Sequence, residues 1–158
     1  MKNFKKTSVH KALDKAQYLC AQKEKCVEDI KQKLFQWGVN KNDFDSIIER
    51  LIEEKFIDEE RYAKAYVKEK FTFNKWGKIK IEYALKQKKI PDQYIQYALD
   101  DIPENEYTQT LEKELIKKRK SIQDTNEHTI KSKLIRFAVS KGFENGKVFD
   151  MVNSMIKE

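Results

Sequence analysis

Residues 81–102 read IEYALKQKKIPDQYIQYALDDI, and this stretch decides the fold. On either side of a short polar turn, apolar side chains recur at the spacing of one face of an α-helix. Pro91 suits the first turn of the helix that follows. The stretch therefore predicts two amphipathic helices joined by a tight turn, and its buried residues are expected to be Ile81, Leu85, Ile90, Ile95, Leu99 and Ile102.

The same six offsets carry apolar residues twice more along the chain. Upstream they fall on Ile30, Leu34, Val39, Phe44, Ile48 and Leu51. Downstream they fall on Leu134, Ala138, Phe143, Val148, Val152 and Met155. Val39, Ile90 and Phe143, which follow the turn-forming residues, lie 51 and 53 residues apart, a spacing typical of tandem helical modules that stack to share a core.

We predict an all-α fold of three tandem three-helix repeats, stacked into an elongated, curved array. Only four Gly and two Pro occur in 158 residues, and no stretch alternates apolar with polar residues as strands do. The predicted repeats span residues 1–56, 57–102 and 103–158. Helices are expected over residues 8–22, 24–37, 42–54, 58–73, 77–89, 92–101, 104–121, 126–141 and 145–157.

The turn of each repeat calls for a residue in the left-handed backbone conformation. Gly38 and Gly142 occupy this place in the first and third repeats and adopt that conformation without strain. The middle repeat has Lys89 instead, for which the conformation costs about 1 kcal/mol. The second repeat therefore either bears this strain or ends its helix differently.

The chain offers little for membrane association or catalysis. No apolar run approaches the roughly 18 residues of a membrane span, and the basic start at residues 1–6 is followed by no apolar stretch of signal-peptide type. We expect a cytoplasmic protein without cofactor or metal, in which Cys20 and Cys26 are reduced and structural. Because no phosphate loop or nucleophile motif is present, we expect no enzyme and no catalytic residue. The acidic residues 58–60 are interpreted as a helix cap.

Charge points to a polyanionic partner. The net charge is +7, and residues 64–89 hold nine lysines against two glutamates, whereas residues 92–112 hold acids and no base. Aromatic residues lie among these lysines, a mixture that serves phosphate contact and base stacking. Packing into the core is the favoured role for Tyr62, Tyr66, Phe73 and Trp76, and a merely solvated face remains an equal alternative for the lysines.

The middle of the chain resembles the RecX family, bacterial regulators of the RecA recombinase. Residues 56–65 read FIDEERYAKA where the family shows a block like LLDDERFARA. Residues 75–78 read KWGK, and Ile81, Leu85 and the run at 88–90 continue the family pattern. The chain departs from that pattern at Glu59, Lys78 and Lys89, changes that affect helix ends.

The resemblance implies a protein that binds in the groove of the RecA filament on single-stranded DNA, and we expect a monomer. It implies inhibition of filament extension, recombinase and ATPase activity, and so modulation of recombination, DNA repair and the SOS response, with duplex DNA as a further partner. The expected RecA and DNA surface consists of basic residues and one aromatic residue: Arg61, Lys64, Lys68, Lys70, Lys75, Trp76, Lys78, Lys80, Lys86, Lys88, Lys89, Lys117, Lys118 and Arg119.

Two other functions remain open from the residues alone. A three-helix unit resembles a helix-turn-helix in outline, so the chain could act as a free-standing DNA-binding module without RecA. It could also be a protein-only scaffold whose lysines provide solubility, in which case binding would be insensitive to salt.

Overall fold

The computed structural model describes residues 8–156, and these form nine α-helices and no strand. The basic start at residues 1–6 and residue 157 of the last predicted helix lie outside this range. The prediction of an all-α fold is confirmed. The helices are α1 (Val9–Gln22), α2 (Val27–Gln36), α3 (Phe44–Glu53, after a 3-10 turn at Lys41–Asp43), α4 (Glu59–Thr72), α5 (Lys78–Gln87), α6 (Asp92–Asp100), α7 (Glu104–Ser121), α8 (Glu127–Ser140) and α9 (Asn145–Met155).

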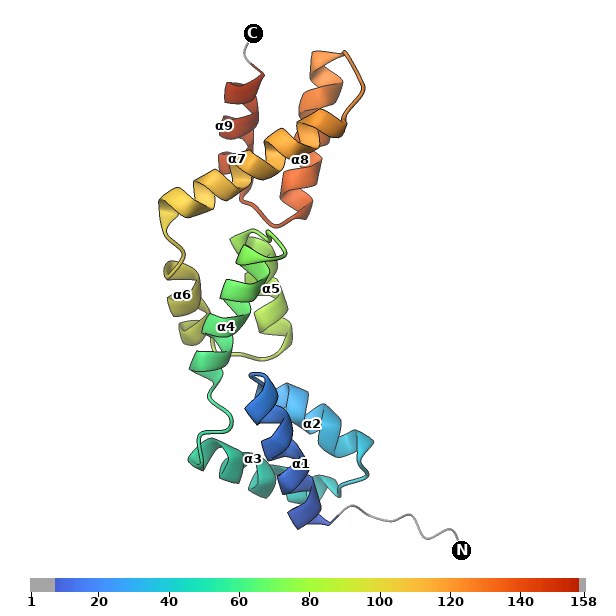
Figure 1. Ribbon diagram of the computed structural model, residues 1–158, viewed down its shortest axis with the longest axis vertical. Coiled ribbons are helices and arrows are strands. Elements are labelled where there is room, and N and C mark those ends of the chain that lie inside the picture. Colours follow the sequence, from blue (N-terminus) through green and yellow to red (C-terminus); the bar gives the residue numbers. More distant parts are fainter. Residues whose placement is uncertain (1–7, 157–158) are drawn as a thin grey trace, which may run out of the picture.

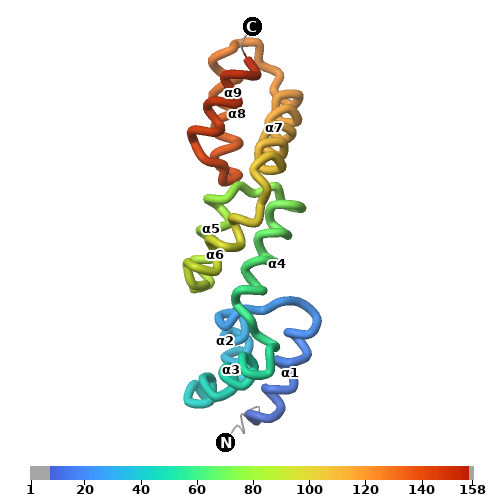
Figure 2. The backbone as a smooth tube through the Cα atoms, turned by 90° about the vertical axis from the view of Figure 1, so that its left-hand side faces the viewer, coloured from blue at the N-terminus to red at the C-terminus, as the bar shows by residue number. Residues whose placement is uncertain are grey.

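The helices pack in three sets of three along one axis (Figures 1 and 2). Module 1 is α1–α3, module 2 is α4–α6 and module 3 is α7–α9. In Figure 1 module 1 lies at the bottom of the elongated molecule and module 3 at the top. The residue boundaries drawn from the sequence at 56/57 and 102/103 stay predictions.

The eighteen repeated apolar positions form the cores of the modules. All of them are buried except Phe44 and Met155, which are half-buried against the same cores. The turns repeat too, because Gly38, Lys89 and Gly142 have φ angles of 76°, 59° and 101°. Lys89 therefore bears the strain that glycine avoids in the other two modules.

The cores are not equally connected. The core of module 1 is a separate cluster, whereas the cores of modules 2 and 3 form one continuous cluster. Cys26, which belongs to module 1 in sequence, is fully buried in that second cluster. The junction between modules 2 and 3 is thus apolar through its centre, and the junction between modules 1 and 2 is more polar.

One predicted helix boundary is wrong. The second helix was expected from residue 24, but α2 begins at Val27. The chain before it leaves helical geometry because Cys26, the N-cap, has an extended backbone and its side chain enters the core of module 2. This contact lies outside module 1, so the periodicity within module 1 does not report it.

Candidate functional site

The contacts between modules account for many of the predicted surface residues. The first amides of a helix have no hydrogen-bond partner within that helix. Module 2 supplies an acceptor for such an amide at the start of α2, and module 3 does the same at the start of α5. At the first junction the Val27 amide donates to Glu59 Oε2 at 3.1 Å. Asp58 instead caps its own helix α4, as the sequence predicted, by accepting from the Arg61 amide at 3.0 Å.

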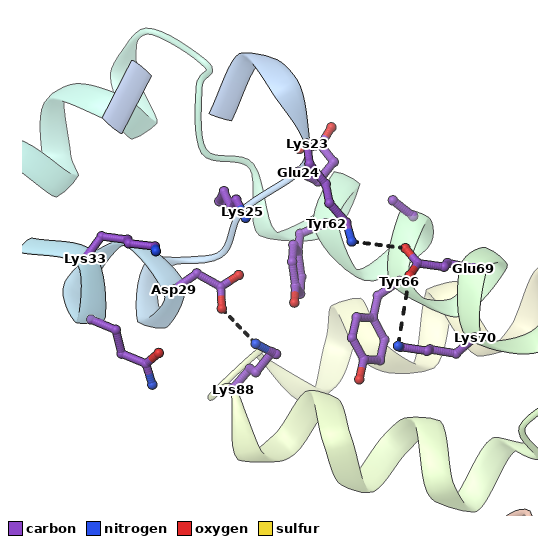
Figure 3. A pocket seen from close by; sticks show the side chains of 12 residues that line it. Lys23, Glu24, Lys25, Asp29, Lys33, Tyr62, Tyr66, Glu69, Lys70 and Lys88 are labelled. Carbon is purple, nitrogen blue, oxygen red and sulfur yellow. Dashed lines mark hydrogen bonds and ion pairs between the residues drawn. The ribbon is translucent and has the colours of Figure 1, made fainter. Parts of the chain in front are cut away.

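Ion pairs complete the junction between modules 1 and 2 (Figure 3). Lys88 Nζ lies 2.7 Å from Asp29 Oδ1, and Lys23 Nζ lies 3.6 Å from Glu69 Oε2. Arg61 pairs with Glu24 and also donates to two main-chain carbonyls. Arg61 and Lys88, both in the predicted binding surface, therefore have structural partners here.

The electrostatics of this junction follow from partial burial. Burial disfavours ionisation of Asp29, but hydrogen bonds from Lys88 and the Cys26 amide outweigh it and hold its pKa below the usual value. The pKa of Lys88 is raised because its pairing with Asp29 outweighs burial. Burial raises the pKa of Glu59, and the hydrogen bond from the Val27 amide offsets only part of this effect.

A cleft of about 490 Å³ lies at the same junction. Its walls carry Tyr62 and Tyr66 and both signs of charge (Figure 3). Glu69 lies between Lys23 and Lys70, and Asp29 faces Lys88. Most of the cations in this cleft already have carboxylate partners. We therefore interpret the cleft as part of the contact between modules 1 and 2 and not as a site for an anionic ligand.

The junction between modules 2 and 3 uses main-chain contacts. The Gly77 amide donates to the Lys141 carbonyl at 2.8 Å, and the Ile79 amide donates to the Gly142 carbonyl at 3.0 Å. The Lys78 amide donates to the Tyr107 hydroxyl at 2.9 Å, and that hydroxyl donates to Glu144. Module 3 therefore supplies the partners of these three amides at the start of α5.

Trp76 lies beside this junction and is half-buried against the shared core. Lys70 Nζ and Lys80 Nζ lie 5.0 and 4.5 Å from its ring centroid. Lys78 Nζ lies 4.8 Å from the Tyr107 ring. These distances are those of cation–π contacts, so the tryptophan and three predicted lysines contribute to packing.

Exposed apolar and basic side chains of module 2 lie together on one face of α5, which we call the α5 face. It consists of Ile79, Tyr83 and Lys86, which share one side of the helix, with Lys75 and Lys89 at the two ends. Ile79 and Tyr83 are 51% and 66% exposed. Lys86 also pairs with the neighbouring Glu82 at 3.8 Å.

The predicted binding surface omitted both apolar members of this face, although Tyr83 is one of the aromatic residues that lie among the lysines. Tyr83 lies two positions after the buried Ile81. Residues two positions apart do not share a helix face, so this spacing indicated that Tyr83 is exposed. The expectation that Phe73 packs into the core is wrong, because its side chain is 79% exposed beyond the end of α4. Tyr62, by contrast, is buried as expected.

The other predicted residues lie apart from the α5 face. Lys64 and Lys68 border a groove of about 310 Å³ between α4 and α6, where Asp101 and Glu106 also lie. Lys117, Lys118 and Arg119 belong to α7 in module 3. The structure thus distributes the predicted surface over several places on the molecule.

The described residues also bear on other kinds of site. Among residues 8–156, no group of three or more His, Cys, Asp or Glu side chains could hold a metal ion. Within that same range, no helix is long and apolar enough to cross a bilayer. Both cysteines are free, and burial raises the pKa of Cys20 and of Cys26 to about 11, which makes both thiols poor nucleophiles at neutral pH.

Comparison with known proteins gives a consistent result. Residues 58–99 match the family model described as RecX, second three-helix domain. The chain is 30% identical over 138 residues to Regulatory protein RecX of Clostridium acetobutylicum, covering 85% of this chain and 64% of that protein. It is 33% identical over 138 residues to the protein of that name from Clostridium botulinum strain Eklund 17B, covering 85% and 61%. The chain thus spans less than two thirds of the length of these relatives.

Solved structures agree at the level of the fold. A crystal structure of regulatory protein RecX superposes with a TM-score of 0.84 at 22% identity, covering 92% of this chain and 73% of that one. RecX from Lactobacillus salivarius superposes with a TM-score of 0.78 at 19% identity, covering 93% and 96%. By the match of residues 58–99, the similar sequences and the shared fold, the chain resembles the RecX family of regulatory proteins.

Proposed function

We propose that this protein regulates RecA by binding the RecA filament on single-stranded DNA, where it hinders filament extension and lowers recombinase and ATPase activity. Similarity to RecX regulatory proteins in sequence and fold supports the proposal. The α5 face is the observation that carries it, since exposed apolar side chains flanked by lysines suit a partner that is part protein and part polyanion.

The test is RecA ATPase activity on single-stranded DNA, titrated with this protein. We expect Lys75→Glu, Lys86→Glu and Lys89→Glu combined to weaken inhibition at least about tenfold, because three favourable contacts become repulsive. Within residues 8–156, no ion pair joins these side chains to another module, so helicity and thermal stability should be retained.

The matched control reverses three lysines outside the proposed surface. Lys41, Lys113 and Lys120 are exposed, form no ion pair within residues 8–156, and change the net charge equally when replaced by Glu. Inhibition by this control variant should stay within about twofold of the parent protein. Equal loss of inhibition in the two triple variants would remove the α5 face from the proposal.

The competing function is a DNA-binding module that acts without RecA. Tight, sequence-dependent binding to duplex DNA by the isolated protein, together with an absence of RecA inhibition, would favour that function. The same titration, with free-DNA binding measured beside it, separates the two.

A further inference from the structure

A second basic surface lies in module 3, in a groove of about 670 Å³ between the end of α7 and the second half of α8. Figure 1 shows these two helices side by side near the top of the molecule. The lining comprises Lys118, Ser121, Ile122, Gln123, Lys133, Arg136, Phe137 and Ser140. It contains three cations and no acid, which distinguishes it from the cleft between modules 1 and 2.

The cations of this groove lack carboxylate partners. The ion pairs of module 3 within the described range use Lys131, Lys141 and Lys147, and none uses Arg136 or Lys133. Two of the other three arginines of the chain, Arg50 and Arg61, are held by glutamates. Arg136 is therefore an available guanidinium, the group that binds a phosphate through two parallel hydrogen bonds.

The floor of the groove is apolar. Ile122, the C-cap residue that follows α7, and Phe137 of α8 are both half-buried in the lining. Lys118 Nζ lies over the Phe137 ring, 5.3 Å from its centroid, so a base that stacks on this face would displace the lysine toward a phosphate. Lys133, Arg136 and Phe137 share one side of α8, because they are separated by three and four positions.

We infer that this groove binds single-stranded nucleic acid, with phosphates on Lys118, Lys133 and Arg136 and an unpaired base against Phe137. A cationic rim beside an aromatic floor matches the chemistry of a nucleotide, and a duplex would keep its base faces stacked and out of reach. The inference deepens the nucleic-acid part of the proposed function and rests on it. It adds Lys133 and Arg136, which sequence reasoning did not select.

The experiment measures binding of a fluorescent twelve-nucleotide thymidine strand to the full chain without RecA, between about 50 and 200 mM salt. Combined Lys133→Glu and Arg136→Glu should weaken binding at least about tenfold and reduce the salt slope by about 1.4, because each phosphate contact on a single strand contributes about 0.7. The control, Lys113→Glu with Lys120→Glu, makes the same charge change on α7 outside the groove. Equal losses in the two double variants would overturn the inference.

Further binding measurements identify the chemical class of the ligand. We expect Arg136→Lys to lose less affinity than the double reversal, and a strand carrying 5-iodouracil to cross-link to Phe137. An abasic strand should bind more weakly than thymidine, and polyglutamate should compete poorly. Binding of the abasic strand as tight as that of thymidine, or competition by polyglutamate of equal charge, would overturn the inference.

Failure of this inference can be told apart from failure of the proposed function. Strand binding without RecA that is insensitive to Arg136→Glu, with RecA inhibition intact, would count against the groove alone. Loss of RecA inhibition by the α5-face variant is measured in a different assay and on a different module. Circular dichroism and thermal unfolding of each variant ensure that lost binding is not lost folding.

Discussion

Gly77 and Gly142 meet at the junction of modules 2 and 3 with no room for a side chain. A Cβ on Gly77 would lie inside van der Waals contact with the main chain of Gly142 and Phe143. Because a main chain cannot swing aside as a long side chain does, the junction would have to separate. The absence of a side chain at Gly77 therefore allows the main chains of the two modules to approach this closely.

We expect Gly77→Ala to lower the free energy of unfolding by about 1 to 3 kcal/mol, the usual cost of overpacking. Urea denaturation followed by circular dichroism measures it. The control is Gly146→Ala, at a helical position where an added Cβ meets nothing within 4 Å. It should be neutral or stabilising by up to about 1 kcal/mol, since alanine favours the helix. A destabilisation as large as that of Gly77→Ala would contradict this explanation.

Asp29 makes the first junction dependent on pH. Its pKa is lower in the folded chain than in the unfolded chain, so ionised Asp29 stabilises the fold at neutral pH. This contribution is fully present above the unfolded value, about 3.9, and is lost as the pH falls through the lower folded value.

We expect the difference in unfolding free energy between the parent protein and Asp29→Asn to be constant from neutral pH to about 5 and to shrink below about 4. Asparagine keeps an acceptor for the Cys26 amide but loses the charge that faces Lys88. Parallel stability curves at every pH would contradict a role for ionised Asp29.

At the scale of the element, the helix period identified the core. Leu85 in α5 and Ile95 in α6 are fully buried. Replacement of either by Ala should cost about 2 to 5 kcal/mol in unfolding free energy, through lost burial and the cavity left behind. Tyr83→Ala, on the exposed side of α5, should change stability by less than about 0.5 kcal/mol. A loss near zero for Leu85→Ala would remove it from the core.

A helix is well predicted from the sequence when the contacts that determine it lie between residues close together in the chain. The buried faces of α5 and α6 follow from residues three and four apart, so their periodicity is visible in the sequence. The late start of α2 depends on Cys26 packing into module 2, and the start of α5 depends on Tyr107, which is 29 residues after Lys78. Contacts of that range leave no periodic signal.

The candidate surface was harder to predict for the same reason. Composition selected lysines in one stretch, but several of them pack on Trp76 or Tyr107 or pair across a junction. Arg136 was overlooked because its availability depends on which carboxylates lie near it in three dimensions. Exposure and pairing are tertiary properties, so residue type alone separates binding side chains poorly from packing ones.

Across the whole molecule, the two junctions differ in chemistry and should differ in response to salt. Modules 2 and 3 share a core, whereas the contact with module 1 includes several ion pairs, each worth about 0 to 1 kcal/mol when exposed. Raising salt to about 1 M shortens the Debye length to about 3 Å and screens such pairs. The orientation of module 1 should then become broader.

Spin-label distance distributions can measure this broadening. Labels at Asp45→Cys and Asp150→Cys span modules 1 and 3, and labels at Tyr97→Cys and Asp150→Cys span modules 2 and 3; all three sites are exposed. The native thiols should react slowly, because burial raises the pKa of Cys20 and Cys26 to about 11. We expect high salt to broaden only the first distribution. Equal broadening of both would contradict the distinction between the junctions.

The main-chain hydrogen bonds at the second junction have a consequence for divergence among homologous chains. Gly77 and Ile79 donate to Lys141 and Gly142 through the backbone, so these bonds are the same whatever side chains the flanking residues carry. Surface substitutions can therefore accumulate on modules 2 and 3 without changing their mutual alignment, provided that both glycines are inherited together. A lineage could in this way exchange one binding surface for another while the spacing between its surfaces stays constant.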